Sequence, residues 1–276
     1  MSFIKTPSQK AEAAIAQADA VLIGAGAGLS TAAGINYDGP DFEKAFADMI
    51  ARYGFTDLYT SSFYPFQSEE EKWAYWSRHI DYARFAPEGK PLYKHLLEMV
   101  QGKEYFVITT NVDGQFAKAG FDPDKVFEVQ GDYSLMQCAT ACHPKRYSNE
   151  SLVKQMVARQ KDCRIPSSLV PRCPVCGGPM EINVRKDRYF VEDDRWHLQA
   201  DRYYSFLEKS LGKRKLVLLE YGVGYNTPTI IRFPFERMAA SYPDVTLIRI
   251  NKDYRDCQTP GIRRFIGLET LFLPGK

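Results

Sequence analysis

A glycine-rich segment near the N-terminus is the first part of the sequence whose residue types could do chemistry. Residues 21–30 read VLIGAGAGLS, and residues 31–34 add further small side chains. An apolar strand that enters a glycine-rich turn and then a helix suits a dinucleotide phosphate. Glycine lets the backbone approach the phosphates, and the helix N-terminus offers unpaired N–H donors. The spacing is Gly-x-Gly-x-Gly, and no ribose-binding acid follows about 20 residues on, so a tight turn without a ligand remains an alternative.

Two polar segments each follow an apolar run. Residues 109–114 read TTNVDG and place Asn111 two positions before Asp113, and residues 128–132 read EVQGD. Open α/β sheets bind their ligands at the C-terminal ends of strands. An amide and a carboxylate there could read the edge of a bound ring and hold a water or hydroxyl. Taken alone, the first segment is equally an ordinary capped turn, and the second predicts no chemistry.

The cysteines are clustered in the middle of the chain. Two close pairs, Cys138 with Cys142 and Cys173 with Cys176, enclose Cys163, and only Cys257 lies elsewhere. Thiolates in two close pairs can complete a tetrahedral zinc site. In a chain of this size such pairs bind metal more often than they form disulfides. We therefore expect structural zinc on the four paired cysteines, with His143 as an alternative to one thiolate.

Short apolar runs without alternation predict the strands that would position these residues. They occupy residues 20–23, 105–108, 126–129, 215–219 and 245–250, and helical periodicity covers residues 91–100 and 229–240. Strands that alternate with helices favour an α/β fold with a Rossmann-like, doubly wound parallel sheet.

Two segments interrupt this alternation. Residues 37–85 hold 14 of the 37 aromatic residues, which favours a helical aromatic-rich lid packed on the sheet over direct stacking on a substrate. Within them, residues 68–71 read SEEE, a capping box that predicts a helix onset. Residues 132–204 carry the paired cysteines and few strand patterns, so they read as an inserted module.

These patterns give a predicted division of the chain. The dinucleotide-binding domain would comprise residues 1–131 and 205–276, with residues 36–94 as its helical loop and lid segment. The small zinc-binding module would comprise residues 132–204.

Composition narrows the class of protein. The chain has 276 residues, of which 45% are hydrophobic and 25% charged, with a formal net charge of +2. This is ordinary globular composition. No run of like charges predicts a nucleic-acid or membrane contact, and no apolar run approaches the roughly 20 residues of a membrane helix. Because the N-terminus lacks a signal-peptide pattern, we expect a cytoplasmic enzyme or binding protein.

Taken together and in order, the motifs resemble the sirtuin (Sir2) family of NAD-consuming enzymes. Residues 26–35, GAGLSTAAGI, are similar to the family's GAGxSxxxGI cofactor loop, and residues 109–113, TTNVD, to its TQNID segment. The paired cysteines match its zinc module. Residues 221–224, YGVG, stand where the family carries GTS, and Asn251 stands where an asparagine contacts the adenosine half of NAD.

The resemblance implies NAD as co-substrate, structural zinc and a set of roles. The residues implied around the pyrophosphate and nicotinamide belong to the glycine loop: Gly26, Ala27, Gly28, Ser30, Gly34 and Ile35. Those implied around the adenosine are Gly222, Val223, Gly224 and Asn251. Asn111 would hold a water or ribose hydroxyl near the anomeric carbon, and Asp113 would bind the nicotinamide carboxamide. Neither NADP nor flavin is expected, although Arg249 and Lys252 lie next to Asn251.

The sequence also departs from the family pattern. Deacylating members follow GI with PDFR, whereas here residues 36–39, NYDG, precede residues 40–42, PDF. The catalytic His-Gly of the family is Gln130-Gly131. In the family the histidine is a general base toward a ribose hydroxyl, a task suited to a pKa near ~6.5. A glutamine amide can only donate and accept hydrogen bonds.

This pattern resembles the macrodomain-linked microbial branch of the family (class M). That resemblance implies an NAD-dependent protein ADP-ribosyltransferase in which Asn111, Asp113 and Gln130 form the catalytic set. It implies a lipoylated carrier protein, related to the glycine-cleavage H protein, as acceptor, and a macrodomain hydrolase as a further partner. Two alternatives stay open: a protein-lysine deacylase in which another residue replaces the histidine, and a catalytically inactive NAD-binding regulatory protein.

Overall fold

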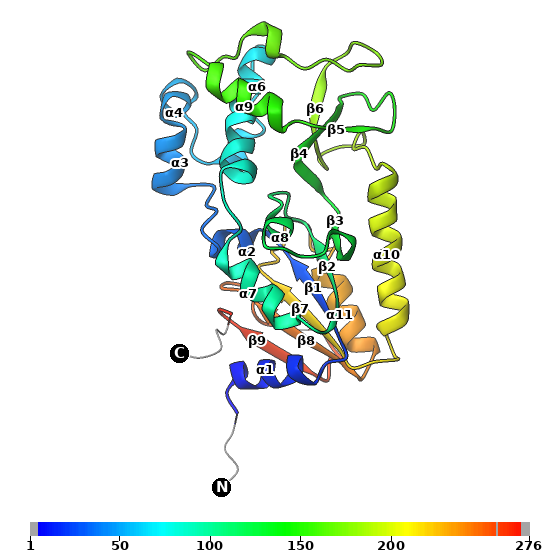
Figure 1. The fold of residues 1–276 in the computed structure, drawn as a ribbon. Coiled ribbons are helices and arrows are strands. Elements are labelled where there is room, and N and C mark those ends of the chain that lie inside the picture. The colour runs from blue at the N-terminus through cyan, green and yellow to red at the C-terminus, as the bar shows by residue number, and fades with distance from the viewer. Residues whose placement is uncertain (1–4, 258, 272–276) are drawn as a thin grey trace.

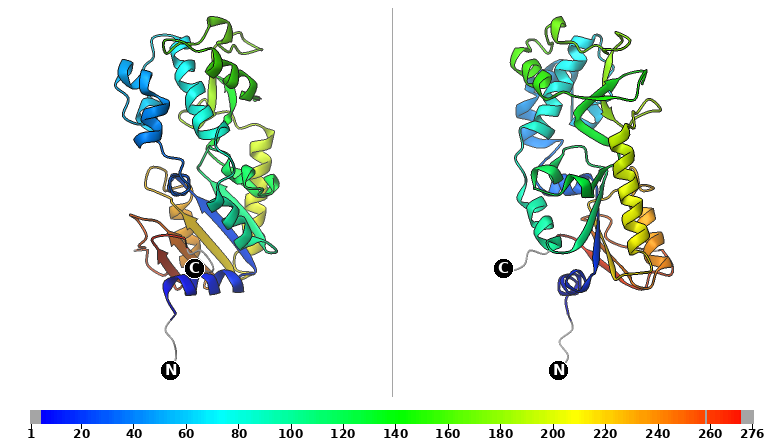
Figure 2. Two further views of the ribbon diagram at one scale, coloured as in Figure 1. Left: turned by 60° about the vertical axis from the view of Figure 1, so that its left-hand side comes forward. Right: turned by 45° about the vertical axis from the view of Figure 1, so that its right-hand side comes forward.

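The computed structural model describes residues 5–257 and 259–271, which form two lobes (Figures 1 and 2). The larger lobe is built on a six-stranded sheet with strand order β3-β2-β1-β7-β8-β9, in which every neighbouring pair is parallel. Its strands are β1 (Ala20–Ala25), β2 (Glu104–Thr109), β3 (Val126–Glu128), β7 (Leu216–Tyr221), β8 (Val245–Ile250) and β9 (Phe265–Leu268).

The sheet confirms the predicted fold class. Each of the five predicted apolar runs is a strand, because both faces of the sheet are covered and most positions are therefore apolar. The edge strand β9 was not predicted. It has only four residues, with Gly267 inside it, and it is partly exposed.

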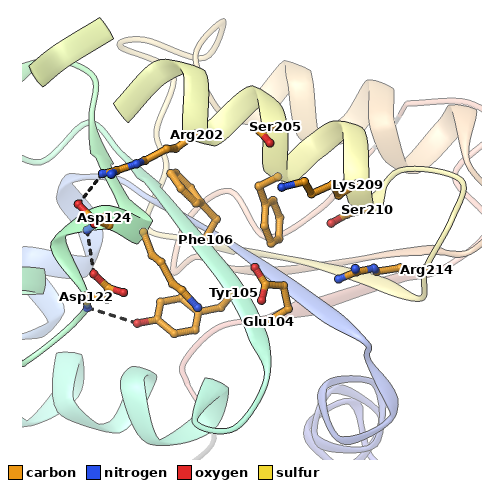
Figure 3. Close-up of a pocket in the computed structure, with 12 residues that line it drawn as sticks. Glu104, Tyr105, Phe106, Asp122, Asp124, Arg202, Ser205, Lys209, Ser210 and Arg214 are labelled. Atoms are coloured by element: carbon orange, nitrogen blue, oxygen red, sulfur yellow. Dashed lines mark hydrogen bonds and ion pairs between the residues drawn. The ribbon is translucent and has the colours of Figure 1, made fainter. Parts of the chain in front are cut away.

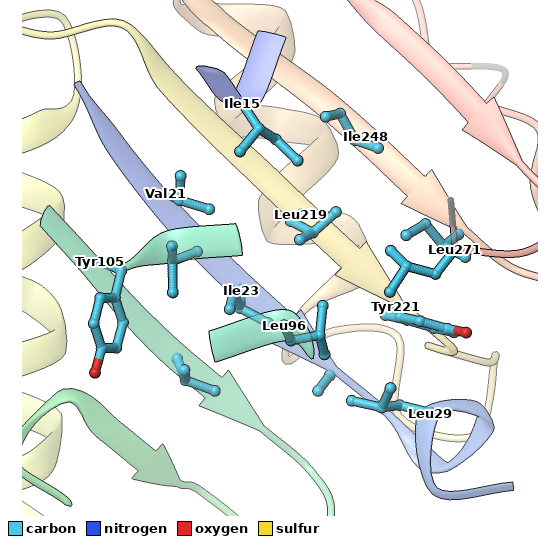
Figure 4. Close-up of a cluster of buried hydrophobic side chains, with 14 of the residues drawn as sticks. Ile15, Val21, Ile23, Leu29, Leu96, Tyr105, Leu219, Tyr221, Ile248 and Leu271 are labelled. Carbon is cyan, nitrogen blue, oxygen red and sulfur yellow. The ribbon is translucent and has the colours of Figure 1, made fainter. Parts of the chain in front are cut away.

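Helices cover both faces of this sheet. One face packs against α1 (Pro7–Gln17), α2 (Ala27–Ala32), α7 (Pro91–Val100) and α8 (Gln115–Lys118), and the other against α10 (Asp194–Ser210) and α11 (Arg232–Ser241). Val21 and Ile23 belong to the first core, with Leu96 and Leu219 (Figure 4), while Leu22 faces the second. Burying each such side chain contributes about 1.5–3 kcal/mol.

The smaller lobe has its own core, shared by two segments far apart in the chain. Its three-stranded antiparallel sheet has the order β5-β4-β6, with β4 (Gly131–Cys138), β5 (Arg146–Ser148) and β6 (Met180–Val184). It is completed by the helices α3 (Gly39–Ala45), α4 (Ala47–Tyr53), α5 (Leu58–Ser61), α6 (Glu69–Ile80) and α9 (Glu150–Arg159).

The aromatic-rich segment contributes most of that core. Phe46, Trp73 and Tyr75 pack with Val153 and Ile182 of the inserted module, and no strand of the large sheet takes part in this cluster of described residues. The expectation that the segment packs on the sheet is therefore wrong. The short strands and the ten-residue helix α9 of the insertion cover only part of this core, and α6 lies along α9 to cover another side.

Two helix boundaries refine the sequence analysis. The predicted onset of α6 is confirmed, since Ser68 Oγ accepts from the Glu71 N–H at 3.3 Å, but the Glu71 carboxylate accepts from the Gln67 N–H instead of closing the capping box. The helix predicted over residues 229–240 begins only at Arg232, because Ile231 has φ −122° and ψ −59°, outside the helical region.

The helix α10 crosses the predicted module boundary at residue 204. It packs against β2 and β3 of the large sheet, and the division of the chain into domains stays a prediction. Of the helices within the described residues, none combines the length and apolar character needed to cross a bilayer.

A buried histidine marks the core of the smaller lobe. The hydroxyl of Tyr75 donates to Leu58 O at 2.7 Å, which uses its only hydrogen, so the Nδ1 of His79, 3.0 Å from that hydroxyl, must be the donor of their hydrogen bond. The Nε2 of His79 is then an acceptor, and it is buried with no hydrogen-bond partner among the described residues. Burial lowers the pKa of His79 to about 3.

The depressed pKa of His79 predicts a specific loss of stability in acid. An unfolded histidine titrates near ~6.5, so below that pH unfolding takes up a proton at His79 until the folded pKa of about 3 is reached. This residue alone should lower the free energy of unfolding by about 1.4 kcal/mol per pH unit in that window. The free energy of unfolding, measured in urea at several pH values between 7 and 4, should fall less steeply with decreasing pH for His79→Gln than for the parent. An equal pH dependence in the two proteins would show that His79 is not held neutral.

Candidate active site

The loops that follow β1 and β7 touch backbone to backbone. The N–H of Gly26 donates to Tyr221 O and the N–H of Gly28 to Gly222 O, both at 3.0 Å. A Cβ on Gly28 would lie 2.7 Å from Gly222 Cα, and a Cβ on Gly222, whose φ is +63°, would lie 2.3 Å from Leu29 N. Glycine is required at these positions because the two loops approach each other closely. The glycine-rich sequence pattern had suggested only the approach of a phosphate as the reason.

A cleft of about 690 Å³ opens over these two loops. It lies at the C-terminal ends of adjacent parallel strands, where ligands of open α/β sheets bind. Seven of the residues predicted to hold the dinucleotide line it: Gly26, Ala27, Gly28, Gly222, Val223, Gly224 and Asn251. The lining also includes the rings of Tyr225 and Tyr254 and the carboxylate-bearing Asp253, which the sequence analysis did not single out.

Beside the cleft, four buried polar side chains form a directed chain of hydrogen bonds. Asn111 Nδ2 donates to Gly26 O at 3.0 Å and to the Tyr93 hydroxyl at 3.3 Å. The Tyr93 hydroxyl is 3.0 Å from Ser30 Oγ, and Ser30 Oγ donates to Asp113 Oδ2 at 2.5 Å. These contacts occupy both amide hydrogens of Asn111 and leave its Oδ1 without a partner among the described residues. Asn111 is therefore prepared to accept a hydrogen bond from a hydroxyl or water.

This series of hydrogen-bonded side chains ends at the carboxylate of Asp113, which is buried away from solvent. Burial raises the pKa of Asp113, while the hydrogen bonds from Ser30 and from the Gln115 N–H, which donates to Oδ1 at 3.0 Å, oppose that shift. Ser30, Asn111 and Asp113 were predicted from the sequence as site residues, whereas Tyr93 was not. Its position on the apolar face of α7 could have indicated a site residue, because the hydroxyl of a buried tyrosine needs a hydrogen-bond partner.

Gln130 lies between β3 and β4, the strand that leads into the smaller lobe. Its backbone carbonyl accepts from the Arg185 N–H at 2.9 Å, and its Oε1 is buried with no hydrogen-bond partner among the described residues. Gly131, with φ +99°, follows it, and a Cβ there would lie 2.0 Å from Asn183 O. Glycine is thus needed after Gln130 for the chain to enter β4.

Acidic groups flank Gln130 on both sides in the sequence. Arg84 holds the carboxylate of Asp132, with Nε–Oδ1 2.9 Å and Nη2–Oδ2 3.2 Å. Burial, and then the neighbouring Asp132, raise the pKa of Glu128 to about 8.

Six predicted residues lie outside the cleft lining: Ser30, Asn111, Asp113 and Gln130, described above, and Gly34 and Ile35. Gly34 and Ile35 border a separate hollow of about 510 Å³ that also involves Lys44, Tyr82 and Lys90. A further hollow of about 470 Å³ lies between β2 and α10 (Figure 3), where Arg202 pairs with Asp124, and it contains none of the predicted site residues.

The four paired cysteines converge as predicted. Their sulfurs all lie within 4.8 Å of one another, with Cys138 and Cys176 separated by 3.7 Å and Cys142 and Cys173 by 3.6 Å. Bonds of about 2.3 Å in a tetrahedral zinc site place sulfurs about 3.8 Å apart, so the cluster fits zinc. His143 Nδ1 lies 3.1 Å from Cys142 Sγ; with four sulfurs already converged, it is not needed as a ligand.

Comparison with known proteins agrees with this geometry. Residues 26–200 match the model of the Sir2 family. A "Protein ADP-ribosyltransferase" of Staphylococcus aureus strain Mu50 is 41% identical over 240 residues, which cover 87% of this chain and 76% of that protein. The chain belongs to the Sir2 family.

Two further relatives of this sirtuin extend the comparison. A "Probable bifunctional ADP-ribose hydrolase/ADP-ribosyltransferase" of Fusarium oxysporum f. sp. cubense is 33% identical over 248 residues, covering 86% of this chain but only 41% of that protein. Among solved structures, a mutant Sir2 homologue in complex with 2′-O-acetyl ADP-ribose matches with a TM-score of 0.58 at 18% identity, over 94% of this chain and 90% of that one. This match shows that the two share a fold.

The cysteine cluster of this sirtuin predicts a metal that stabilises the smaller lobe and takes no part in the chemistry. Cys173→Ser should remove the zinc and lower the thermal unfolding midpoint strongly, because the metal ties β4 to the segment before β6. Cys163→Ser is the control, since Cys163 Sγ lies away from the cluster, 3.5 Å from Asp48 Oδ2. Metal analysis that finds no zinc in the parent, or a Cys173 variant as stable as the Cys163 variant, would contradict this assignment.

Proposed function

We propose that this sirtuin is an NAD-dependent protein ADP-ribosyltransferase that displaces nicotinamide from NAD and joins the ADP-ribose to a protein acceptor. The observation that carries the proposal is that residue 130, where the resemblance places the family's catalytic histidine, is a glutamine. The Staphylococcus relative supports this proposal, because it is named "Protein ADP-ribosyltransferase".

We propose that NAD occupies the cleft over the loops after β1 and β7. The seven predicted residues in its lining support this site, as does the ADP-ribose derivative held by the similar solved structure. The guanidinium of Arg249 is wholly buried and bound to Glu220 and Glu236, so it is not available for the 2′-phosphate of NADP, whereas Lys252 lines the cleft.

The residues at the site would act by positioning and by electrostatics. The reaction breaks the bond between nicotinamide and the ribose and attaches the acceptor to the same carbon, through a transition state with positive charge on the ribose. Asn111, fixed by Gly26 O and Tyr93, presents Oδ1 to a ribose hydroxyl. Asp113, fixed by Ser30 and the Gln115 N–H, offers a carboxylate for the nicotinamide amide.

Gln130 separates the proposed transfer from deacylation. Deacylation by the family uses a base to deprotonate a ribose hydroxyl, and an amide cannot accept that proton. Of the adjacent acids, Asp132 is bound by Arg84, and burial together with Asp132 raises the pKa of Glu128 to about 8. The unpartnered Oε1 of Gln130 can instead accept a hydrogen bond from the ribose or the acceptor.

For the acceptor we propose a lipoylated carrier protein of the glycine-cleavage H type, as the resemblance to the macrodomain-linked branch implies. A macrodomain hydrolase that removes the modification is the proposed second partner. The Fusarium relative supports that pairing, since its name joins an ADP-ribose hydrolase to an ADP-ribosyltransferase.

Gln130 variants test the proposed chemistry. Gln130→Ala should cut ADP-ribose transfer to the lipoylated carrier by about 10²-fold or more, since lost transition-state contacts of this kind typically cost a few kcal/mol. NAD affinity by calorimetry should change little. Gln130→His should not raise the transfer rate. Mass spectrometry of the carrier would measure the transfer, and an alanine variant as active as the parent would contradict the proposal.

Tyr93 should matter through its hydroxyl alone. Tyr93→Phe keeps the ring packed on Phe116, whose centroid is 4.9 Å away, but removes a partner from both Ser30 and Asn111. Transfer should fall roughly tenfold, the equivalent of one hydrogen bond of about 1.4 kcal/mol. Tyr105→Phe is the matched control, because Tyr105 lies in the same core and its hydroxyl contacts only the Asp122 N–H. Equal rates for the two variants would remove Tyr93 from the site.

A further inference from the structure

A network of buried charges lies behind the cleft. Glu220 of β7 is wholly buried, and its carboxylate receives two hydrogen bonds from Arg249 of β8, Nε–Oε1 2.7 Å and Nη2–Oε2 2.9 Å. Arg232 of α11 approaches the same carboxylate at 3.5 Å. The two arginines are 0% and 2% exposed. Buried ion pairs are costly to desolvate and contribute little to stability compared with apolar side chains of similar size.

The remaining donors of the two arginines reach the loops that line the cleft. Arg249 Nη1 donates to Asp256 O at 2.9 Å, and Arg232 Nη2 donates to Tyr254 O at 3.1 Å. Arg232 Nη1 also donates to Val223 O at 3.4 Å. The network therefore ties the loop after β7 and the loop after β8 to one buried carboxylate.

The loop after β8 is organised further by Asn251. Its Nδ2 donates to Val223 O at 3.0 Å, and its Oδ1 accepts from the N–H groups of Asp253 and Tyr254 at 3.1 and 3.0 Å. Val223, Asn251, Asp253 and Tyr254 all line the cleft, whereas Glu220 and the two arginines do not. Through hydrogen bonds, the two arginines reach the cleft at the backbone carbonyls of Val223 and Tyr254.

Two tyrosines, Tyr225 and Tyr254, also connect the network to the cleft. The guanidinium of Arg232 lies 4.5 Å from the centroid of the Tyr225 ring, and the Tyr225 and Tyr254 rings meet edge to face at 5.0 Å. Both rings line the cleft. Glu236 completes the charge balance, since it accepts from Arg249 Nη2 at 2.7 Å, so that two arginines face two carboxylates.

We propose that Glu220 is a positioning residue for NAD, which acts through Arg232 and Arg249 to hold residues 251–256 and Val223 in the shape that receives the adenosine half. This inference rests on the proposed NAD site. A purely structural network would stabilise the fold without any particular effect on the cofactor, and the two roles can be separated experimentally.

Glu220→Gln keeps the size of the side chain but removes the charge that holds both guanidinium groups. The affinity for NAD and for ADP-ribose should fall at least tenfold in calorimetry. The KM for NAD should rise by a similar factor while kcat changes less than twofold, because the residues next to the reacting carbon belong to other elements. In hydrogen exchange, the amides of residues 251–257 should exchange faster than in the parent.

The chain offers a matched control in the smaller lobe. The carboxylate of Glu71 is also buried and also bridges two arginines, Arg52 and Arg164, each at 3.1 Å. Glu71→Gln should lower the thermal unfolding midpoint yet leave NAD affinity and the exchange of residues 251–257 unchanged. Arg249→Lys is the second variant should Glu220→Gln fail to fold. It keeps the charge but cannot span Glu220 and Asp256 O together, and it should raise the KM for NAD in the same way.

The outcomes are distinguishable. Unchanged NAD affinity or unchanged exchange over residues 251–257 in the Glu220 or Arg249 variant would overturn the inference and leave the proposed function standing. Equal loss of NAD affinity in the Glu71 variant would also overturn it, because the effect would then be one of general stability. A folded parent protein that binds no NAD would overturn the proposed function and the cofactor role of Glu220 together.

Discussion

The close approach of Gly28 and Gly222 is the contact on which the rest of the site depends. Their hydrogen bond of 3.0 Å joins the loops at the ends of two adjacent parallel strands, and a side chain on either residue would force them apart. The carbonyl beside one end of this contact, Gly26 O, anchors Asn111, and the carbonyl beside the other, Val223 O, anchors Asn251. The two halves of the cleft are thus placed relative to each other by backbone atoms.

One connection between this frame and the second lobe is β4, which follows β3 of the large sheet. β4 begins at Gly131, directly after Gln130, and ends at Cys138, one of the four clustered cysteines. A metal at the cluster would fix the far end of the strand, while Arg84 holds Asp132 near its start. Residue 130 itself carries an amide and no titratable base, which is the physical difference between the proposed transfer and deacylation.

Much of the fold could be predicted from the sequence, because local patterns determined it. Strands covered on both faces show continuous apolar runs, and five such runs identified five of the six parallel strands. The short edge strand β9 lacked that signal because it is only partly covered. The packing partner of the aromatic segment could not be predicted, since Phe46 and Trp73 look equally apolar whether they meet the sheet or the insertion.

The residues of the candidate site could likewise be predicted only in part. Glycines and cysteines were identifiable because their spacing reflects a local constraint. The four paired cysteines form one cluster and four of the predicted glycines line one cleft, whereas Gly34 borders another hollow. Tyr93, Glu220 and Arg249 were not identified, because a tyrosine in an apolar helix and single charges in apolar strands reveal their partners only after distant segments meet. Hydrogen bonds between residues far apart in the chain leave no pattern in one sequence.

The most direct test of the account is nicotinamide release by the parent protein, measured with and without lipoylated carrier and with acyl-lysine peptides. The account predicts that the carrier accelerates release and gains one ADP-ribose for each nicotinamide freed, while the peptides keep their acyl groups. Release that depends on acyl-lysine peptides and removes their acyl groups, with no ADP-ribose on the carrier, would contradict it.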